Sequence, residues 1–237
     1  MKRKKKIIVL LMAALLGSFY LSGCNLMRLL NPPPTPIPPT PEPLTELTIC
    51  LGYEPDSLYP YKAASQAAHE VLQAIYDGPI DVPGSGPPEP VILKKMPSLS
   101  DGSAFFTPVS IADGDEVVNT YGDLVALQPG TRVFPSGCTS PTCAIAWDGA
   151  TPLQVDQLTA SYELLDGLKW SDGQPLSASD SLYAFQVASD PATPVSKNAV
   201  NQTASYTVVN DTTIEWVGKP GLVTDAFEDY FWAPMPE

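Results

Sequence analysis

Cysteine thiols are the most reactive side chains in this sequence of 237 residues, and one of the four stands in a setting suited to covalent modification. Cys24 directly follows Ser22 and Gly23, whose small side chains leave room for a peptidase to cut before the cysteine. The freed thiol can then accept a lipid. This pattern resembles the bacterial lipobox, so we expect Cys24 to be the lipidation site.

The segment before Cys24 has the order of a secretory signal. A basic block, 2–6, precedes an apolar run, 7–20, which is short for a membrane span. Residues 1–23 are therefore predicted to be a lipoprotein signal peptide. The alternative is a signal anchor with an incidental cysteine.

Prolines dominate the next segment. Eight of the thirteen residues in 31–43 are proline, which favours a polyproline II spacer about 40 Å long. Residues 24–43 are predicted to be a lipidated cysteine and a stiff tether. The competing interpretation is a ligand for a proline-recognition domain. The anchored protein is expected outside the cytoplasm, in the periplasm or at the cell surface.

Two further cysteines lie close together in the sequence. Cys138 and Cys143 close a tight loop, and in an oxidising compartment they are expected to form a disulfide. A zinc site would need two more ligands, and the only histidine, His69, is far away in sequence. Cys50 stands in the apolar run 47–51 and is predicted to be a buried strand thiol.

The sequence shows no constellation for catalysis or metal binding. A Ser-His-Asp triad would have to use His69, but no Gly-x-Ser-x-Gly elbow is present. The acidic residues Asp113, Asp115 and Glu116 lack the spacing of a calcium loop. We therefore predict a protein that is not an enzyme and holds no metal or cofactor.

Charge excludes another class of partner. The chain has 13 basic and 26 acidic residues, and removal of 1–23 takes away five basic residues, which leaves a net charge of about −18. Such a surface repels nucleic acid and anionic lipid, so nucleic acid is not an expected partner. The expected membrane contact is the lipid on Cys24.

The remaining sequence predicts strands and helices in mixed order. Residues 65–76 carry apolar side chains at helical spacing, and Ser177 with Asp180 forms a capping-box pair that begins a second helix. Residues 168–170 are expected to pair back on the preceding strand. The expected strands are 47–52, 115–119 with 123–127, 160–165, and 204–209 with 212–217. The order lacks the βαβ rhythm of a doubly wound sheet and favours an α/β class with a mixed sheet.

Three segments carry a resemblance to a known family. The first reads LTICLGYEPDSLYPY followed by AAHEVLQAIYDGP, the second YELLDGLKWSDGQPLSASDSLYAFQ, and the third TASYTVVNDTTIEW. The first resembles the opening strand, loop and helix of one family. The second resembles the characteristic hairpin and helix of that family, and the third the hairpin that follows, all in the expected order. That family is the extracellular solute-binding proteins of peptide-type ABC importers, family 5.

The resemblance implies a periplasmic-binding-protein-like fold of class II, in which helices flank a mixed β-sheet. It assigns 44–79 to the first segment of lobe I, 80–157 to an inserted small domain II, and 158–237 to the continuation of lobe I. Family members are usually much longer, so the fold is expected to be incomplete, with the C-terminal lobe missing. The ending agrees with this expectation, because no later residue covers Phe231 and Trp232.

The resemblance also implies where a ligand would bind. The contact segment of the first lobe follows the family's Ser-Leu-x-Pro motif, which here means Ala64, Ser65 and Gln66, with Tyr61 close by. The competing interpretation is that these three residues only begin a helix and that the tyrosine only packs.

The expected function is that of a substrate-binding lipoprotein of an ABC import system. It would capture peptides or similar small polar solutes outside the membrane and deliver them to permease subunits. Two other classes remain open. One is a sensory or adhesive lipoprotein that uses the same fold without transport, and the other is a lipid-anchored cell-envelope enzyme.

Overall fold

The computed structural model describes residues 48–236 apart from 77, 82–83, 85 and 151. The chain divides into two compact units, Met1–Cys50 and Leu51–Glu237. The predicted signal peptide, the lipidation site Cys24 and the proline-rich tether lie outside the described residues. Cys50 is exposed and stands outside any strand, so the prediction of a buried strand thiol is wrong.

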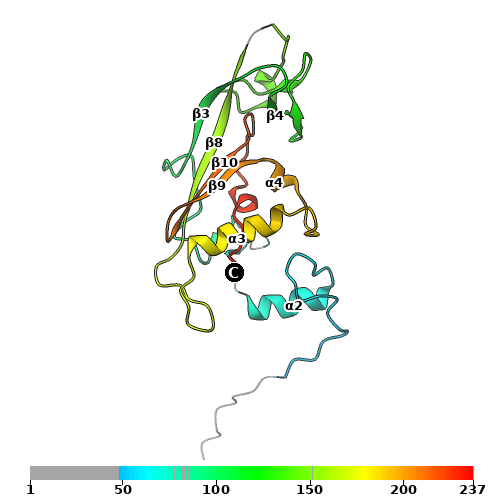
Figure 1. Cartoon of the computed structure of the whole chain (residues 1–237), viewed down its shortest axis with the longest axis vertical. Coiled ribbons are helices and arrows are strands. Elements are labelled where there is room, and N and C mark those ends of the chain that lie inside the picture. Colours follow the sequence, from blue (N-terminus) through cyan, green and yellow to red (C-terminus); the bar gives the residue numbers. More distant parts are fainter. Residues whose placement is uncertain (1–47, 77, 82–83, 85, 151, 237) are drawn as a thin grey trace, which may run out of the picture. The chain divides into compact units, whose positions relative to one another are not determined.

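A four-stranded sheet runs through the second unit (Figure 1). Its order is β3 (Ala104–Ile111), β8 (Leu153–Glu163), β10 (Thr213–Gly218) and β9 (Thr203–Asn210). The α/β class is confirmed. All neighbouring strands of this sheet are antiparallel rather than mixed, and the predicted hairpin of β9 and β10 reverses the chain directly.

Three α-helices are described: α2 (Gln66–Ile75), α3 (Ala178–Ser189) and α4 (Asn198–Asn201). The predicted capping box begins α3, because the backbone N–H of Ser177 donates to the carboxylate of Asp180 at 2.7 Å. The fully buried positions of α3 are small residues, which let the helix lie close to β9 and β10. No helix in the described part of the chain is both long enough and apolar enough to cross a membrane.

Short elements complete the second unit. The 3₁₀ helices are η1 (Pro141–Cys143) and η2 (Phe227–Tyr230), and the short strand pairs are β1 (Ile80–Asp81) with β2 (Glu89–Pro90), β4 (Glu116–Val118) with β5 (Leu124–Ala126), and β6 (Arg132–Val133) with β7 (Ile145–Ala146). The β4–β5 hairpin confirms the predicted pair of strands at 115–119 and 123–127.

Another strand prediction is wrong. Residues 168–170 do not pair back on β8. They pair with 174–176 across a tight turn, where the N–H of Leu176 donates to Leu168 O at 3.0 Å. A hairpin between these close neighbours in sequence satisfies their backbone groups locally.

Buried side chains form two groups. The larger group packs the central sheet against α3 and the C-terminal residues. The smaller group consists of Ile111, Val117, Leu127, Val133, Trp147 and Val155. Strand β8 contributes to both, with Val155 in the smaller group and Leu158 in the larger, so the expected boundary between 157 and 158 falls inside one continuous strand.

The C-terminal aromatic residues are covered by earlier parts of the chain. Phe231 and Trp232 are both buried. The ring centroid of Trp232 lies 4.6 Å from that of Phe185 on α3 and 4.8 Å from that of Tyr206 on β9. Both pairs of rings meet edge-on. These aromatic side chains are therefore buried against residues that precede them in the chain.

Candidate functional site

One carboxylate holds the segment that was expected to contact a ligand. Asp56, in the loop before α2, accepts hydrogen bonds from the backbone N–H groups of Ala64 and Ser65, both at 3.1 Å. The hydroxyl of Ser65 donates to the same carboxylate at 2.8 Å. These donors, the Ser65 hydroxyl first, lower the pKa of Asp56. These bonds join the two ends of the loop from 56 to 65.

Ser65 also begins helix α2. Its Oγ accepts a hydrogen bond from the N–H of Ala68 at 3.2 Å, as an N-cap residue does. The side chain of Gln66 donates to Glu70 one turn later at 3.1 Å. The carbonyl oxygen of Ala64 accepts no hydrogen bond from any described residue. The segment therefore offers a ligand a carbonyl acceptor, whereas the backbone N–H groups of Ala64 and Ser65 are already used.

Tyr61 attaches the same loop to α3. Its hydroxyl donates to the carbonyl oxygen of Ala184 at 3.1 Å, and its ring lies edge-on to Tyr59 at 5.8 Å. Burial raises the pKa of Tyr61 to about 12. The structure thus brings Ala64, Ser65 and Gln66 together at the start of α2 and places Tyr61 as an anchor of the loop.

Sequence reasoning gave no role to Asp56. Its only signal was an acidic residue directly before Ser57 and Leu58 in the motif, nine positions ahead of a serine that begins a helix. A hydrogen bond across a loop of this length follows no helical or strand period, so periodicity could not pair the two residues.

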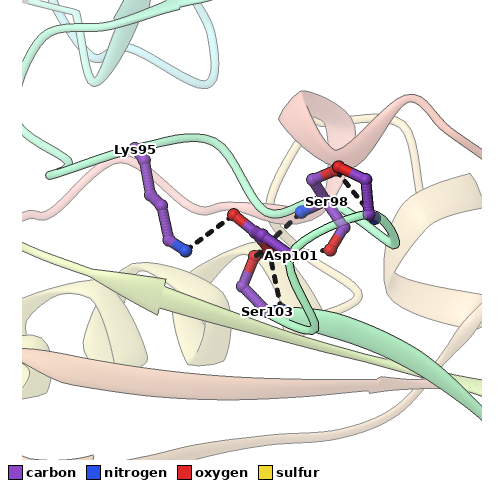
Figure 2. A network of polar contacts seen from close by, with 5 residues as sticks. Lys95, Ser98, Asp101 and Ser103 are labelled. Carbon is purple, nitrogen blue, oxygen red and sulfur yellow. Dashed lines mark hydrogen bonds and ion pairs between the residues drawn. The ribbon is translucent and has the colours of Figure 1, made fainter.

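A second polar network, drawn in Figure 2, precedes strand β3. The ammonium group of Lys95 lies 2.7 Å from the carboxylate of Asp101, which also accepts the hydroxyl of Ser103. The bond from Lys95 is the main reason that the pKa of Asp101 lies far below its usual range. The Oγ of Ser103 accepts from the N–H of Ser98 at 2.9 Å. The serine hydroxyl is therefore committed to closing a turn and is not arranged as a nucleophile.

The structure joins Cys138 and Cys143 in a disulfide with 5.7 Å between their Cα atoms. Asp156 of β8 fastens the adjoining turn: its carboxylate accepts the hydroxyl of Ser136 at 2.5 Å and the N–H of Gly137 at 2.8 Å. The disulfide loop is thus tied directly to the central sheet.

No group of three or more His, Cys, Asp or Glu side chains within the described ranges is placed to hold a metal ion. An open depression of about 680 Å³ lies between the β4–β5 hairpin and β6. Its lining includes none of the four expected ligand residues.

A comparison with known families matches the region that contains β8, α3, β9 and β10. Residues 149–227 match the family model described as the middle region of bacterial extracellular solute-binding proteins, family 5. These elements are therefore similar to the middle region of extracellular solute-binding proteins. The resemblance to family 5 that the sequence motifs carry is confirmed for this segment.

Solved structures with a similar arrangement include two substrate-binding proteins. One is the oligopeptide-binding protein from Thermus thermophilus in complex with a pentapeptide, at 16% identity and a TM-score of 0.44, covering 72% of this chain and 21% of that protein. The other is the ABC transporter substrate-binding protein CtaP from Listeria monocytogenes, at 18% identity and a TM-score of 0.41, covering 77% of this chain and 26% of that protein. The chain thus spans about a fifth to a quarter of the length of these proteins. Among curated proteins, none matches the chain significantly.

Proposed function

We propose that the chain is part of the substrate-binding component of an ABC import system and has no catalytic activity. In this proposal it captures peptides or similar small polar solutes outside the membrane and delivers them to permease subunits. The observation that carries the proposal is the family 5 match over residues 149–227. The loop held by Asp56 supports it, because a binding segment that is already ordered loses less conformational entropy when a ligand arrives.

The chemistry of the contact segment suits an extended ligand. A peptide lying against it would donate backbone N–H groups to carbonyl oxygens such as that of Ala64. Gln66, two positions further along, would lie beside the same extended ligand. Backbone pairing gives affinity without selecting a side chain. Closure of two lobes about a hinge would then enclose the ligand and select the closed state.

We propose the domain assignment given by the sequence resemblance. Residues 44–79 and 158–237 form parts of lobe I, and 80–157 form the small domain II inserted between them. The smaller buried group, whose members all lie between 111 and 155, supports a separate core for the insertion. Because β8 crosses the boundary, the insertion and the lobe share a strand.

The anchor in this proposal is a lipid on Cys24, followed by the proline-rich tether. A tether raises the effective concentration of the binding protein near its permease while leaving its lobes free to close. Labelling of cells with a radioactive fatty acid tests the anchor. The label is expected on the unaltered chain and on Cys50→Ala, and absent from Cys24→Ala. Label retained on Cys24→Ala would remove the lipidation proposal.

Calorimetry with a library of di- to pentapeptides tests the binding function. The 237-residue chain is compared with a form that also contains a complete second lobe. We expect saturable binding by the complete form and much weaker binding by the chain alone, because a single lobe makes only part of the contacts. A complete form that binds no peptide would contradict the peptide proposal, and tight binding by the chain alone would contradict the domain assignment.

A further inference from the structure

The open depression between the β4–β5 hairpin and β6 differs chemically from the segment held by Asp56. Its volume of about 680 Å³ lies within the range of pockets that bind small molecules. The turn at 119–121, strand β5 and the segment 128–132 supply its lining. Strand β5 contributes Val125 and Ala126, an apolar strip beside the polar side chains of the two turns.

The first turn is fixed by its own hydrogen bonds. The side-chain oxygen of Asn119 accepts the backbone N–H groups of Tyr121 at 2.8 Å and Asp123 at 3.0 Å. The N–H of Thr120 donates to the carbonyl oxygen of Arg132 at 3.0 Å, which joins the turn to β6. The ring of Tyr121 stands 77% exposed on this fixed turn. The turn therefore holds the ring of Tyr121 in an exposed position.

The second turn is equally constrained. The N–H of Thr131 donates to Gln128 O at 2.9 Å, and Thr131 Oγ1 accepts the N–H of Gln128 at 3.1 Å. Gly130 has a φ of 95°, which a residue with a side chain rarely adopts, and Pro129 before it fixes the other corner. Both turns thus hold the rim of the depression without help from a ligand.

The side chains on this rim that remain available can all donate hydrogen bonds. The guanidinium of Arg132 makes no hydrogen bond or ion pair with any described residue, although acidic residues outnumber basic ones two to one in the chain. The amide of Gln128 and the phenol of Tyr121 are likewise without a described partner. The carboxamide of Asn119 is committed to its own turn. A positive charge with further donors beside an apolar strip is complementary to an anion that carries an apolar body.

We propose that this depression binds a small carboxylic acid with an apolar or aromatic body. The planar guanidinium of Arg132 pairs with the two carboxylate oxygens, which is the geometry that arginine recognises best. The body of the ligand lies against Val125 and the ring of Tyr121. This site uses none of the residues assigned to peptide capture, so it stands or falls independently of the proposed transport function.

Titration of the 15N-labelled 237-residue chain tests the proposal with three probes: 3-phenylpropionate, its neutral amide and acetate. We expect saturable shifts at Tyr121, Thr131 and the Arg132 side-chain N–H with 3-phenylpropionate. The amide should bind more weakly by about tenfold or more, because it lacks the charge-assisted pair. Acetate should also bind about tenfold more weakly, since it lacks the apolar body.

Variants separate the contribution of Arg132 from general electrostatics. Arg132→Gln is expected to abolish the preference for acid over amide, whereas Lys169→Gln, which removes a positive charge elsewhere on the surface, should retain it. Equal binding of acid and amide by the unaltered chain would overturn the proposal, and that comparison needs no variant. Acetate binding as tight as that of 3-phenylpropionate would overturn the role of the apolar strip.

Discussion

The carboxylate of Asp56 accepts the hydroxyl of Ser65 at 2.8 Å, and the same serine oxygen caps helix α2 by accepting the N–H of Ala68. One pair of side chains therefore determines where the loop closes and where the helix begins. The expected ligand segment lies at this junction, so the charge state of Asp56 contributes to its conformation.

Acidification is expected to release the loop. The pKa of Asp56 is lowered in the folded chain, chiefly by the Ser65 hydroxyl. The stabilisation from this carboxylate is therefore present above its unfolded pKa, about 3.9, and is lost as pH falls through the lower folded value. The amide proton shifts of Ala64 and Ser65, followed by NMR, should titrate together with a midpoint below the unfolded value.

The matched variants for this titration are Asp56→Asn and Asp113→Asn. In Asp56→Asn, the amide shifts of Ala64 and Ser65 should have at every pH the values that the unaltered chain shows only at low pH. Asp113 is an exposed aspartate in another loop, so Asp113→Asn should leave the titration unchanged. Titration of both amides in Asp56→Asn as in the unaltered chain would show that another group controls the loop.

Tyr61→Phe is expected to lower the free energy of unfolding by about 1 kcal/mol, because it removes a partly buried hydrogen bond to Ala184 O. Urea denaturation measures the change, and Tyr59→Phe is the control, since its hydroxyl has no described partner. The pKa of Tyr61 is raised from 10.0 to about 12. Its contribution should thus be complete below pH 10 and lost as pH rises through about 12, and Tyr61→Phe should lack that part of the alkaline loss.

Reduction of the Cys138–Cys143 disulfide is expected to destabilise the chain by about 2 kcal/mol. The sequence separation of 5 gives a short closed loop, for which the chain-entropy model yields a loss of this size. Denaturation with and without a reductant measures it, and the Cys138→Ser/Cys143→Ser double variant should reproduce the reduced value. A reductant effect that persists in the double variant would have another origin.

Local features of the fold were predictable from the sequence. The β9–β10 hairpin and the Ser177–Asp180 capping box each depend on residues within a few positions of one another, and both occur as predicted. Two of the three family motifs, the second and the third, lie within the segment that the family model matches, whereas the first lies outside it.

Features that depend on distant residues were not predictable in this way. Trp232 is covered by Phe185 and Tyr206, which precede it by more than twenty positions, so its burial follows from tertiary packing alone. Residues 168–170 pair with 174–176 rather than with β8, because β8 already pairs with β3 on one side and β10 on the other. The roles of Ala64, Ser65 and Gln66 toward a ligand remain a prediction.

Gly221→Ala is expected to loosen the attachment of the small core to the central sheet. Gly221 has a φ of 82°, and an added Cβ would lie 2.7 Å from the carbonyl oxygen of Val118 and 2.9 Å from Val117 Cγ2. Positive φ alone costs about 1–2 kcal/mol for alanine, and the contact with β4 adds a comparable amount, so a loss of about 3 kcal/mol is expected.

Gly173→Ala is the matched control, because Gly173 has a φ of 89° but no atom within 4 Å of the added Cβ. Denaturation should give a loss for Gly221→Ala that exceeds the loss for Gly173→Ala by about 1 kcal/mol or more, the lower limit for overpacking. Equal losses would mean that β4 moves away at no cost, and that the insertion is not held by this contact.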